Sequence, residues 1–174
     1  KSPYLGLCYG LQPAVVQYAR SVLGLKQANS TEIDPHAPHP VIYDIPFDKK
    51  FQTIKGKGTS MRLGGWDCQV REGSLPEEIY DSCHAWKDKK NRLVSERHRH
   101  RYEVNNKYVP QLEAAGLMFT GWSPELKLAE FIELPRSVHP FFLATQPHPE
   151  YKSRPLAPHP IFLAFLDAVS KQMV

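Results

Sequence analysis

The sequence is poor in cysteine and has no long apolar run, and both shortages limit what the chain can be. Its three cysteines are an odd number, and their spacing fits neither a set of disulfides nor paired metal-binding motifs. No stretch approaches the roughly 20 consecutive apolar residues of a membrane-spanning helix, and we see no signal-peptide pattern at the start. We therefore expect a soluble, cytoplasmic protein with no membrane partner.

The sequence also lacks a large excess of either positive or negative charge. The formal net charge is only +4, and much of the positive charge is local, in residues 87–92 and 97–101. Such a balance does not by itself argue for a nucleic-acid partner, and we expect none. The length of 174 residues and the 41% hydrophobic content fit one domain, residues 1–174.

A cysteine flanked by glycines follows a short apolar strand near the start of the chain. Gly6, Cys8 and Gly10 form the pattern Gly-x-Cys-x-Gly, which is typical of a nucleophile on a sharp strand-to-helix turn with small residues on either side. The following helix, predicted over residues 11–23, should place its positive end beside the sulfur and favour the thiolate. The alternative is that Cys8 is only a small buried hydrophobic residue.

A candidate base lies at the other end of the chain. The apolar strand predicted over residues 141–145 leads into His148 and Glu150, at the strand end where α/β sheets usually place their chemistry. On an extended segment these two side chains leave the backbone on the same side, which suits a Cys-His-Glu arrangement. Alone, His148 would be interpreted as a surface-loop histidine.

These two motifs together resemble the class I (triad-type) glutamine amidotransferases. Three further stretches resemble the glutaminase domain of the CTP synthase family: residues 23–32, residues 61–64 and, most specifically, Glu-Arg-His-Arg-His-Arg-Tyr-Glu-Val-Asn at 96–105. The resemblance runs from Tyr4 to the last helix. It implies an α/β fold, a class I glutamine amidotransferase (flavodoxin-like) sheet flanked by helices with some antiparallel strands.

The resemblance also implies a role for each candidate residue. Cys8 would attack the side-chain amide of L-glutamine, His148 would protonate the departing ammonia and then activate water, and Glu150 would orient His148. Two charged residues would hold the α-carbon end of glutamine, with Glu32 receiving its α-amino group and Arg101 its α-carboxylate. Four neighbouring residues would line the pocket: Tyr9, Gly10, Leu11 and Gln12. The backbone N–H that follows Cys8 would stabilise the oxyanion.

Cofactors and partners are implied for the whole family rather than for this domain. No cofactor or metal is expected here, whereas the full enzyme would use ATP, UTP and Mg, with GTP as an activator. The ammonia would aminate UTP to CTP in a synthetase domain of the same polypeptide, which would also assemble a homo-oligomer, a tetramer. Because the family has early strands and a glycine-rich oxyanion loop before the elbow, we expect residues 1–174 to lack the N-terminal part of the fold.

Two other functions remain open at this point. The chain could be a non-catalytic fragment, or a regulatory or assembly module that keeps the fold without a complete oxyanion hole. It could also be a related γ-glutamyl thiol hydrolase.

The basic block at 97–101 has a two-faced pattern. On a strand, Arg97, Arg99 and Arg101 share one side while His98 and His100 share the other, so the block predicts a strand rather than a polybasic tail. A His-x-His pair can bind a metal, but no third ligand has a suitable spacing.

Patterning predicts the remaining elements. We expect a loop at 27–40, a strand at 41–45, two strands at 59–63 and 66–70 joined by a turn at Gly64-Gly65, and a surface insertion at 81–92. A helix at 110–115 and strands at 117–121, 129–134 and 141–145 should follow. The helix at 11–23 should pack through Ala14, Val15, Tyr18, Ala19 and Val22, and a final helix at 158–173 through Ile161, Phe162, Phe165, Leu166 and Val169.

Overall fold

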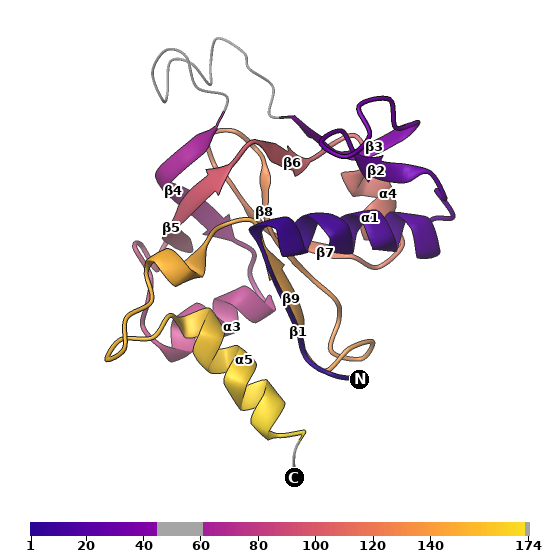
Figure 1. Cartoon of the computed structure of the whole chain (residues 1–174). Helices are drawn as coiled ribbons and strands as arrows, with labels where there is room; N and C mark the ends of the chain where they lie inside the picture. The colour runs from indigo at the N-terminus through magenta and orange to yellow at the C-terminus, as the bar shows by residue number, and fades with distance from the viewer. Residues whose placement is uncertain (45–60, 173–174) are drawn as a thin grey trace.

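The structure is a computed structural model, and it describes residues 1–44 and 61–172. A six-stranded sheet forms the centre, in the order β1-β9-β8-β7-β4-β5 (Figure 1). Only β1 and β9 run parallel, and the other neighbours are antiparallel. Its strands are β1 (Tyr4–Leu7), β4 (Arg62–Val70), β5 (Leu93–His100), β7 (Met118–Trp122), β8 (Ala129–Glu133) and β9 (Phe142–Thr145). A second sheet has the order β2-β3-β6, from β2 (Ala28–Ser30), β3 (His39–Asp44) and β6 (Tyr102–Val104).

Helices cover both faces of the central sheet. Because successive strand residues point to opposite faces, Ile132 and Ala144 pack under α1 (Leu11–Ser21), whereas Phe131 and Leu143 pack against the side of α3 (Leu75–Ser82) and α5 (Pro160–Ser170). The helix α4 (Val109–Ala114) joins the first of these two cores. This mixed sheet with helices on both faces is the predicted fold class.

The predicted turn at Gly64-Gly65 is wrong. Residues 62–70 form one strand that pairs with β5 straight through both glycines, with Gly64 opposite His98 and Gly65 opposite Arg97. Gly64 has a φ of +80°, so it allows a local distortion inside a continuous strand rather than a reversal of the chain. Residues 59–60 of the predicted first strand lie outside the described residues.

The prediction of a loop at 27–40 is correct for residues 31–38 and wrong at both ends, where β2 and the start of β3 lie. These strands pair with each other in spite of their polar composition. The predicted strand at 41–45 corresponds to β3, and residue 45 lies outside the described residues. The helix α3 was not predicted, although Ser74 caps it by accepting a hydrogen bond from the Glu77 N–H at 3.3 Å. The segment 81–92 begins inside that helix, and Trp86 packs back on it, with its ring centroid 5.8 Å from that of Tyr80 and its indole N–H donating to Asp81 at 2.8 Å.

The predicted packing faces of the first and last helices are only partly correct, and Phe162 and Val169 of the last helix are absent from the hydrophobic core that α5 covers. Val22 lies beyond the end of α1 and is 51% exposed, and Leu166 on α5 is 61% exposed. The packed side of α5 carries Ile161, Ala164, Phe165 and Ala168. The helix predicted at 110–115 and the three strands predicted after it are present within a residue or two. No helix among the described residues is long and apolar enough to cross a membrane.

Candidate active site

Cys8 lies on a sharp turn between a strand and a helix. The strand β1 ends at Leu7, residues 8–10 form one 3-10 turn, and α1 begins at Leu11. Cys8 has a φ of 47°, in the left-handed region that residues other than glycine rarely adopt. The strand-turn-helix arrangement expected of a nucleophile elbow is therefore present, with the strain at the candidate nucleophile itself.

The two flanking glycines are not equivalent. A Cβ atom on Gly6 would lie 2.9 Å from the carbonyl carbon and oxygen of Gly10 and 2.9 Å from the Tyr4 hydroxyl. A Cβ atom on Gly10 would approach only the same hydroxyl, at 4.0 Å. The Tyr4 hydroxyl also donates to the Gly10 carbonyl at 2.8 Å, which ties the turn to the strand. Close packing thus requires glycine at position 6 only.

His148 and Glu150 form a tight pair, by a different geometry from the predicted one. His148 Nδ1 lies 2.5 Å from Glu150 Oε1. The segment is not extended through Glu150, because a 3-10 turn at Pro149–Tyr151 brings the carboxylate back to the ring. The His148 N–H donates to the Arg97 carbonyl at 2.8 Å, and the ring stacks on Tyr151 with a centroid distance of 5.0 Å. The other ring nitrogen, Nε2, is buried and accepts or donates no hydrogen bond within the described chain.

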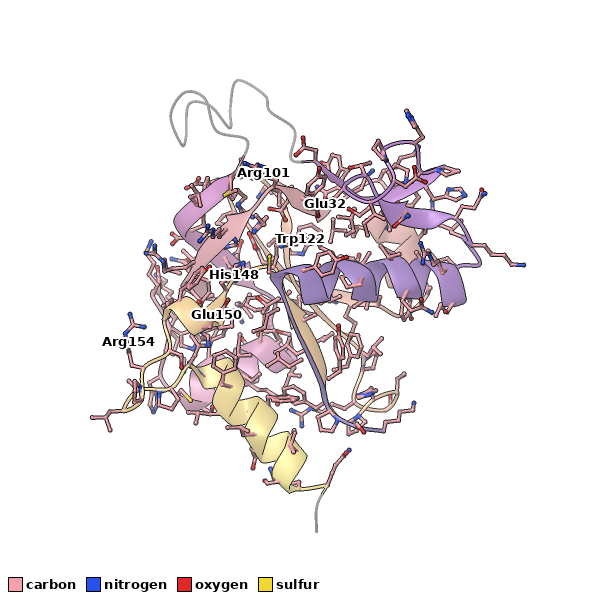
Figure 2. The ribbon with its side chains drawn as sticks, in the orientation of Figure 1. Glu32, Arg101, Trp122, His148, Glu150 and Arg154 are labelled. Carbon is pink, nitrogen blue, oxygen red and sulfur yellow. The ribbon has the colours of Figure 1, made fainter. Side chains whose placement is uncertain are left out.

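The fold brings the elbow and the histidine segment to the same end of neighbouring strands. β1 and β9 are parallel, with Leu7 opposite Thr145, so Cys8 and Gln146 leave the sheet side by side. Gln146 Nε2 donates to Cys8 Sγ at 3.5 Å. No direct hydrogen bond joins Cys8 to His148 among the described residues, as in many active sites before substrate binds. Figure 2 shows His148 and Glu150 next to each other on this side of the molecule.

The expectation that Cys8 rests as a thiolate is wrong. Burial of the side chain raises the pKa of the Cys8 thiol to about 11, and the negative charge of Glu103 adds to this effect. The Tyr9 N–H and the Gln146 amide lower the pKa by donating to the sulfur, but they do not outweigh burial. Cys8 is therefore a thiol at neutral pH, and it needs a base to become a nucleophile.

A buried ionic cluster lies close to the elbow, and we did not predict it from the sequence. Arg62 contacts Glu103 and Glu130, each at 2.7 Å, with all three side chains at 0% exposure. His100 lies 2.6 Å from Glu103, and His98 lies 3.7 Å from Glu130. Burial opposes ionisation of both carboxyls, yet His100 and Arg62 hold the pKa of Glu103 below its ordinary value. Burial and the Glu103 charge raise the pKa of Glu130 to about 8.

The two histidines raised as metal candidates thus face carboxylates from two other strands. Among residues 1–44 and 61–172, no three His, Cys, Asp or Glu side chains are grouped so that they could hold a metal ion. The cluster is an ionic support of the site in this structure. Its carboxyls come from β6 and β8 and its arginine from β4, so it joins the two sheets close to the elbow.

The residues predicted to bind glutamine are only partly brought together. A hollow of about 220 Å³ runs from Tyr9 of the elbow along α1. It is lined by Gln12, Pro13, Val16, Gln17 and Arg20 of that helix, and by Asn29, Ser30 and Ile33 of the second sheet and its connection. Leu11 is fully buried in the core, so only its backbone can face a ligand.

Glu32 and Arg101 are both exposed, and they lie above His148 in the view of Figure 2. Neither side chain makes a hydrogen bond or an ion pair within the described part of the chain. Gln146, Glu103 and Arg62 were not singled out in the sequence. Only Gln146 carried a signal, since it directly follows a buried strand two residues before His148.

Comparison with known proteins points to one family. The sequence profile of the glutamine amidotransferase class-I family matches residues 1–168. CTP synthase of Caldanaerobacter subterraneus subsp. tengcongensis is 53% identical over 97% of this chain and 29% of its own length. CTP synthase of Pyrobaculum calidifontis is 48% identical over 99% of this chain and 30% of its own length.

Comparison with solved structures supports the same family. The structure described as "Trypanosoma brucei CTPS - glutaminase domain with bound acivicin" has a TM-score of 0.81 and 35% sequence identity, over 97% of this chain and 60% of that one. The chain spans under a third of the length of the two curated relatives. Because the family profile covers nearly all of its residues, the chain belongs to the class I glutamine amidotransferase family.

Proposed function

We propose that this chain is the glutaminase part of a CTP synthase. It hydrolyses L-glutamine to glutamate and ammonia, and a synthetase domain of the same polypeptide uses the ammonia to aminate UTP to CTP. One observation carries the proposal: a cysteine on a strained elbow and a paired His148 and Glu150 leave adjacent parallel strands at the same end of the sheet. The relatives named CTP synthase support the choice of reaction.

The reaction begins with the Cys8 thiol. Its sulfur attacks the side-chain amide carbon of glutamine while its proton passes to His148 Nε2, the buried nitrogen that has no other partner among the described residues. The negative charge moves to the former amide oxygen, where the Tyr9 N–H donates to it. His148 then gives its proton to the departing nitrogen, ammonia leaves, and a glutamyl thioester remains on Cys8.

Hydrolysis of the thioester uses the same histidine, with water in place of the thiol. His148 Nε2 takes a proton from water, the hydroxide attacks the thioester, and glutamate leaves as the sulfur recovers the proton. Glu150 accepts from Nδ1 in both halves of the reaction, so the lone pair stays on Nε2 and the imidazolium is stabilised when it forms.

Glutamine binding rests on charge complementarity. Glu32 would face the α-ammonium group and Arg101 the α-carboxylate, because a planar guanidinium suits a carboxylate. Tyr9, Gln12 and the backbone of Gly10 and Leu11 would surround the side-chain amide, next to the hollow that runs along α1.

The remaining parts of the proposal concern the whole polypeptide. This chain needs no cofactor or metal of its own, ATP, UTP and Mg bind in the synthetase domain, and GTP activates the enzyme. The protein acts in the cytoplasm as a homo-oligomer, a tetramer.

A glutamine-mimicking electrophile tests the proposal directly. We expect one adduct per chain, mapped to Cys8 by peptide mass, formed much faster than at the exposed Cys83 and prevented by glutamine. Cys8→Ser should abolish both the adduct and ammonia release. Labelling no faster than at Cys83 would instead indicate a non-catalytic or assembly module, and faster cleavage of γ-glutamyl peptides than of glutamine would indicate a thiol hydrolase.

A further inference from the structure

Two buried carboxamides connect the sulfur of Cys8 to a main-chain carbonyl. Gln146 is fully buried, its Nε2 donates to Cys8 Sγ at 3.5 Å, and its Oε1 lies 3.5 Å from Gln12 Nε2. Gln12 is 4% exposed, and the same Nε2 atom donates to the Tyr102 carbonyl at 3.0 Å. The chain of contacts therefore runs from β6 through α1 to the residue that follows β9, and ends at the nucleophile.

The carbonyl fixes the direction of every hydrogen bond in this chain. A main-chain carbonyl can only accept, so Gln12 must turn its NH₂ group toward Tyr102. The same NH₂ group also donates to Gln146, so the side-chain oxygen of Gln146 is the acceptor. The NH₂ group of Gln146 is then left pointing at Cys8, so the sulfur is an acceptor in this contact.

A donor in this position acts differently on the two forms of the sulfur. A thiol is a weak acceptor, whereas a thiolate is charged and binds an N–H donor much more strongly. The Gln146 backbone is held as well, since its N–H donates to the Glu130 carbonyl at 2.9 Å. The donor is thus fixed at both its backbone and its side chain before any charge forms.

We propose that Gln146 is a positioning residue for the nucleophile, holding the sulfur of Cys8 on the elbow and stabilising the negative charge that develops there during attack. The Tyr102 carbonyl sets the direction of this hydrogen bond through Gln12. The inference rests on the proposed function in one respect, that the sulfur of Cys8 is the attacking atom.

The test measures the sulfur itself, independently of glutamine. In the full natural polypeptide that contains these residues, the rate of Cys8 alkylation by iodoacetamide is followed against pH by peptide mass. Gln146→Met keeps the volume and removes the donor. We expect its Cys8 to react about tenfold more slowly than the wild type at pH 8, with the whole rate profile moved to higher pH, since one hydrogen bond to a charged group accounts for about that factor.

Thr145→Val is the matched control. Thr145 is the preceding residue, it is equally buried, and its hydroxyl has no hydrogen-bond partner in the described part of the chain. Its Cys8 profile should equal that of the wild type. Gln146→Glu keeps the shape but adds a negative charge beside the sulfur, and it should slow alkylation further than Gln146→Met at every pH above neutral.

The other two cysteines report on folding in the same experiment. Cys68 is fully buried and should stay unlabelled in a folded variant, while the exposed Cys83 gives the reference rate. If Gln146→Met exposes Cys68, the comparison is made with Gln146→Glu, which keeps an oxygen toward Gln12. An unchanged Cys8 profile in the folded variant overturns the inference.

Glutamine hydrolysis and Cys8 alkylation are measured separately, so failure of the proposed function can be distinguished from failure of this inference. If the wild type does not hydrolyse glutamine but its Cys8 alkylation depends on Gln146, only the proposed function fails. If glutamine is hydrolysed and Cys8 alkylates alike in the wild type and the folded Gln146 variant, only this inference fails.

Discussion

Replacing Gly6 by alanine should damage the elbow, whereas the same replacement at Gly10 should not. The new Cβ at position 6 would lie 2.9 Å from backbone atoms of Gly10, where carbon atoms in contact are normally about 3.5–4.0 Å apart. Relief requires the turn to move away from β1, because the atoms it meets are backbone rather than a flexible side chain. Overpacking of this kind costs about 1–3 kcal/mol of unfolding free energy.

Position 10 is the matched control. Gly10 has a φ of −60°, which alanine adopts readily, and its Cβ would have space. Gly10→Ala should therefore leave the protein equally stable or stabilise it by about 0.4–1 kcal/mol, since alanine restricts the unfolded chain.

Urea denaturation of the wild type and the two variants measures the difference. We expect a lower midpoint for Gly6→Ala with an unchanged m-value, and slower labelling of Cys8 because the turn that carries it has moved. The two variants share the same chemical change and lie on the same turn. Equal destabilisation by both would refute the argument that close packing at position 6, and not glycine flexibility in general, shapes the elbow.

Three further predictions concern ionisable groups. Glu150→Gln removes the carboxylate that holds His148, and it should lower kcat for ammonia release by about 10²- to 10⁴-fold with little change in KM; a loss in KM alone would assign Glu150 to binding. Because the pKa of the Cys8 thiol is raised to about 11, wild-type alkylation should rise nearly tenfold per pH unit from pH 7 to 10, and a plateau below pH 9 would contradict it. The pKa of Glu130 is raised from 4.5 to about 8 in the fold, so its contribution to stability is complete below pH 4.5 and is lost as the pH rises to 8. Glu130→Gln should make the unfolding free energy less dependent on pH between 6 and 8, and parallel curves for variant and wild type would exclude this assignment.

The sequence was informative where the chemistry is local. Glycines two residues on either side of Cys8 predicted the elbow, because a turn of this kind constrains only its immediate neighbours. His148 and Glu150 were found together because they are two residues apart, so even a wrong backbone conformation left them in contact. The glycine pair at 64–65 misled because two adjacent glycines predict a turn from local sequence alone. Pairing with β5 on both sides of these glycines keeps β4 continuous.

The buried ionic cluster near the site could not be predicted, because it depends on contacts between strands that are distant in the sequence. Arg62, Glu103 and Glu130 come from β4, β6 and β8, and the residues next to them in the sequence do not mark them as fully buried ionisable groups. The hydrophobic pattern shows which face of a strand is inward, but it cannot show that an inward charge finds a partner on another strand. The direction of the thiol pKa shift was missed for this reason, since burial and Glu103 together cause it.

The opposing effects on Cys8 explain why a fixed histidine is needed at this site. The Tyr9 N–H and the Gln146 amide stabilise negative charge on the sulfur, but burial and Glu103 oppose it more strongly, so the resting group is a thiol. Such a sulfur becomes nucleophilic only as its proton leaves, and under the proposed function the acceptor is His148 Nε2. Glu150 keeps that nitrogen unprotonated by accepting from Nδ1, at a distance of 2.5 Å. Donors and base then act on the same charge at the same moment, when a substrate carbonyl lies beside the elbow and can accept the electron pair.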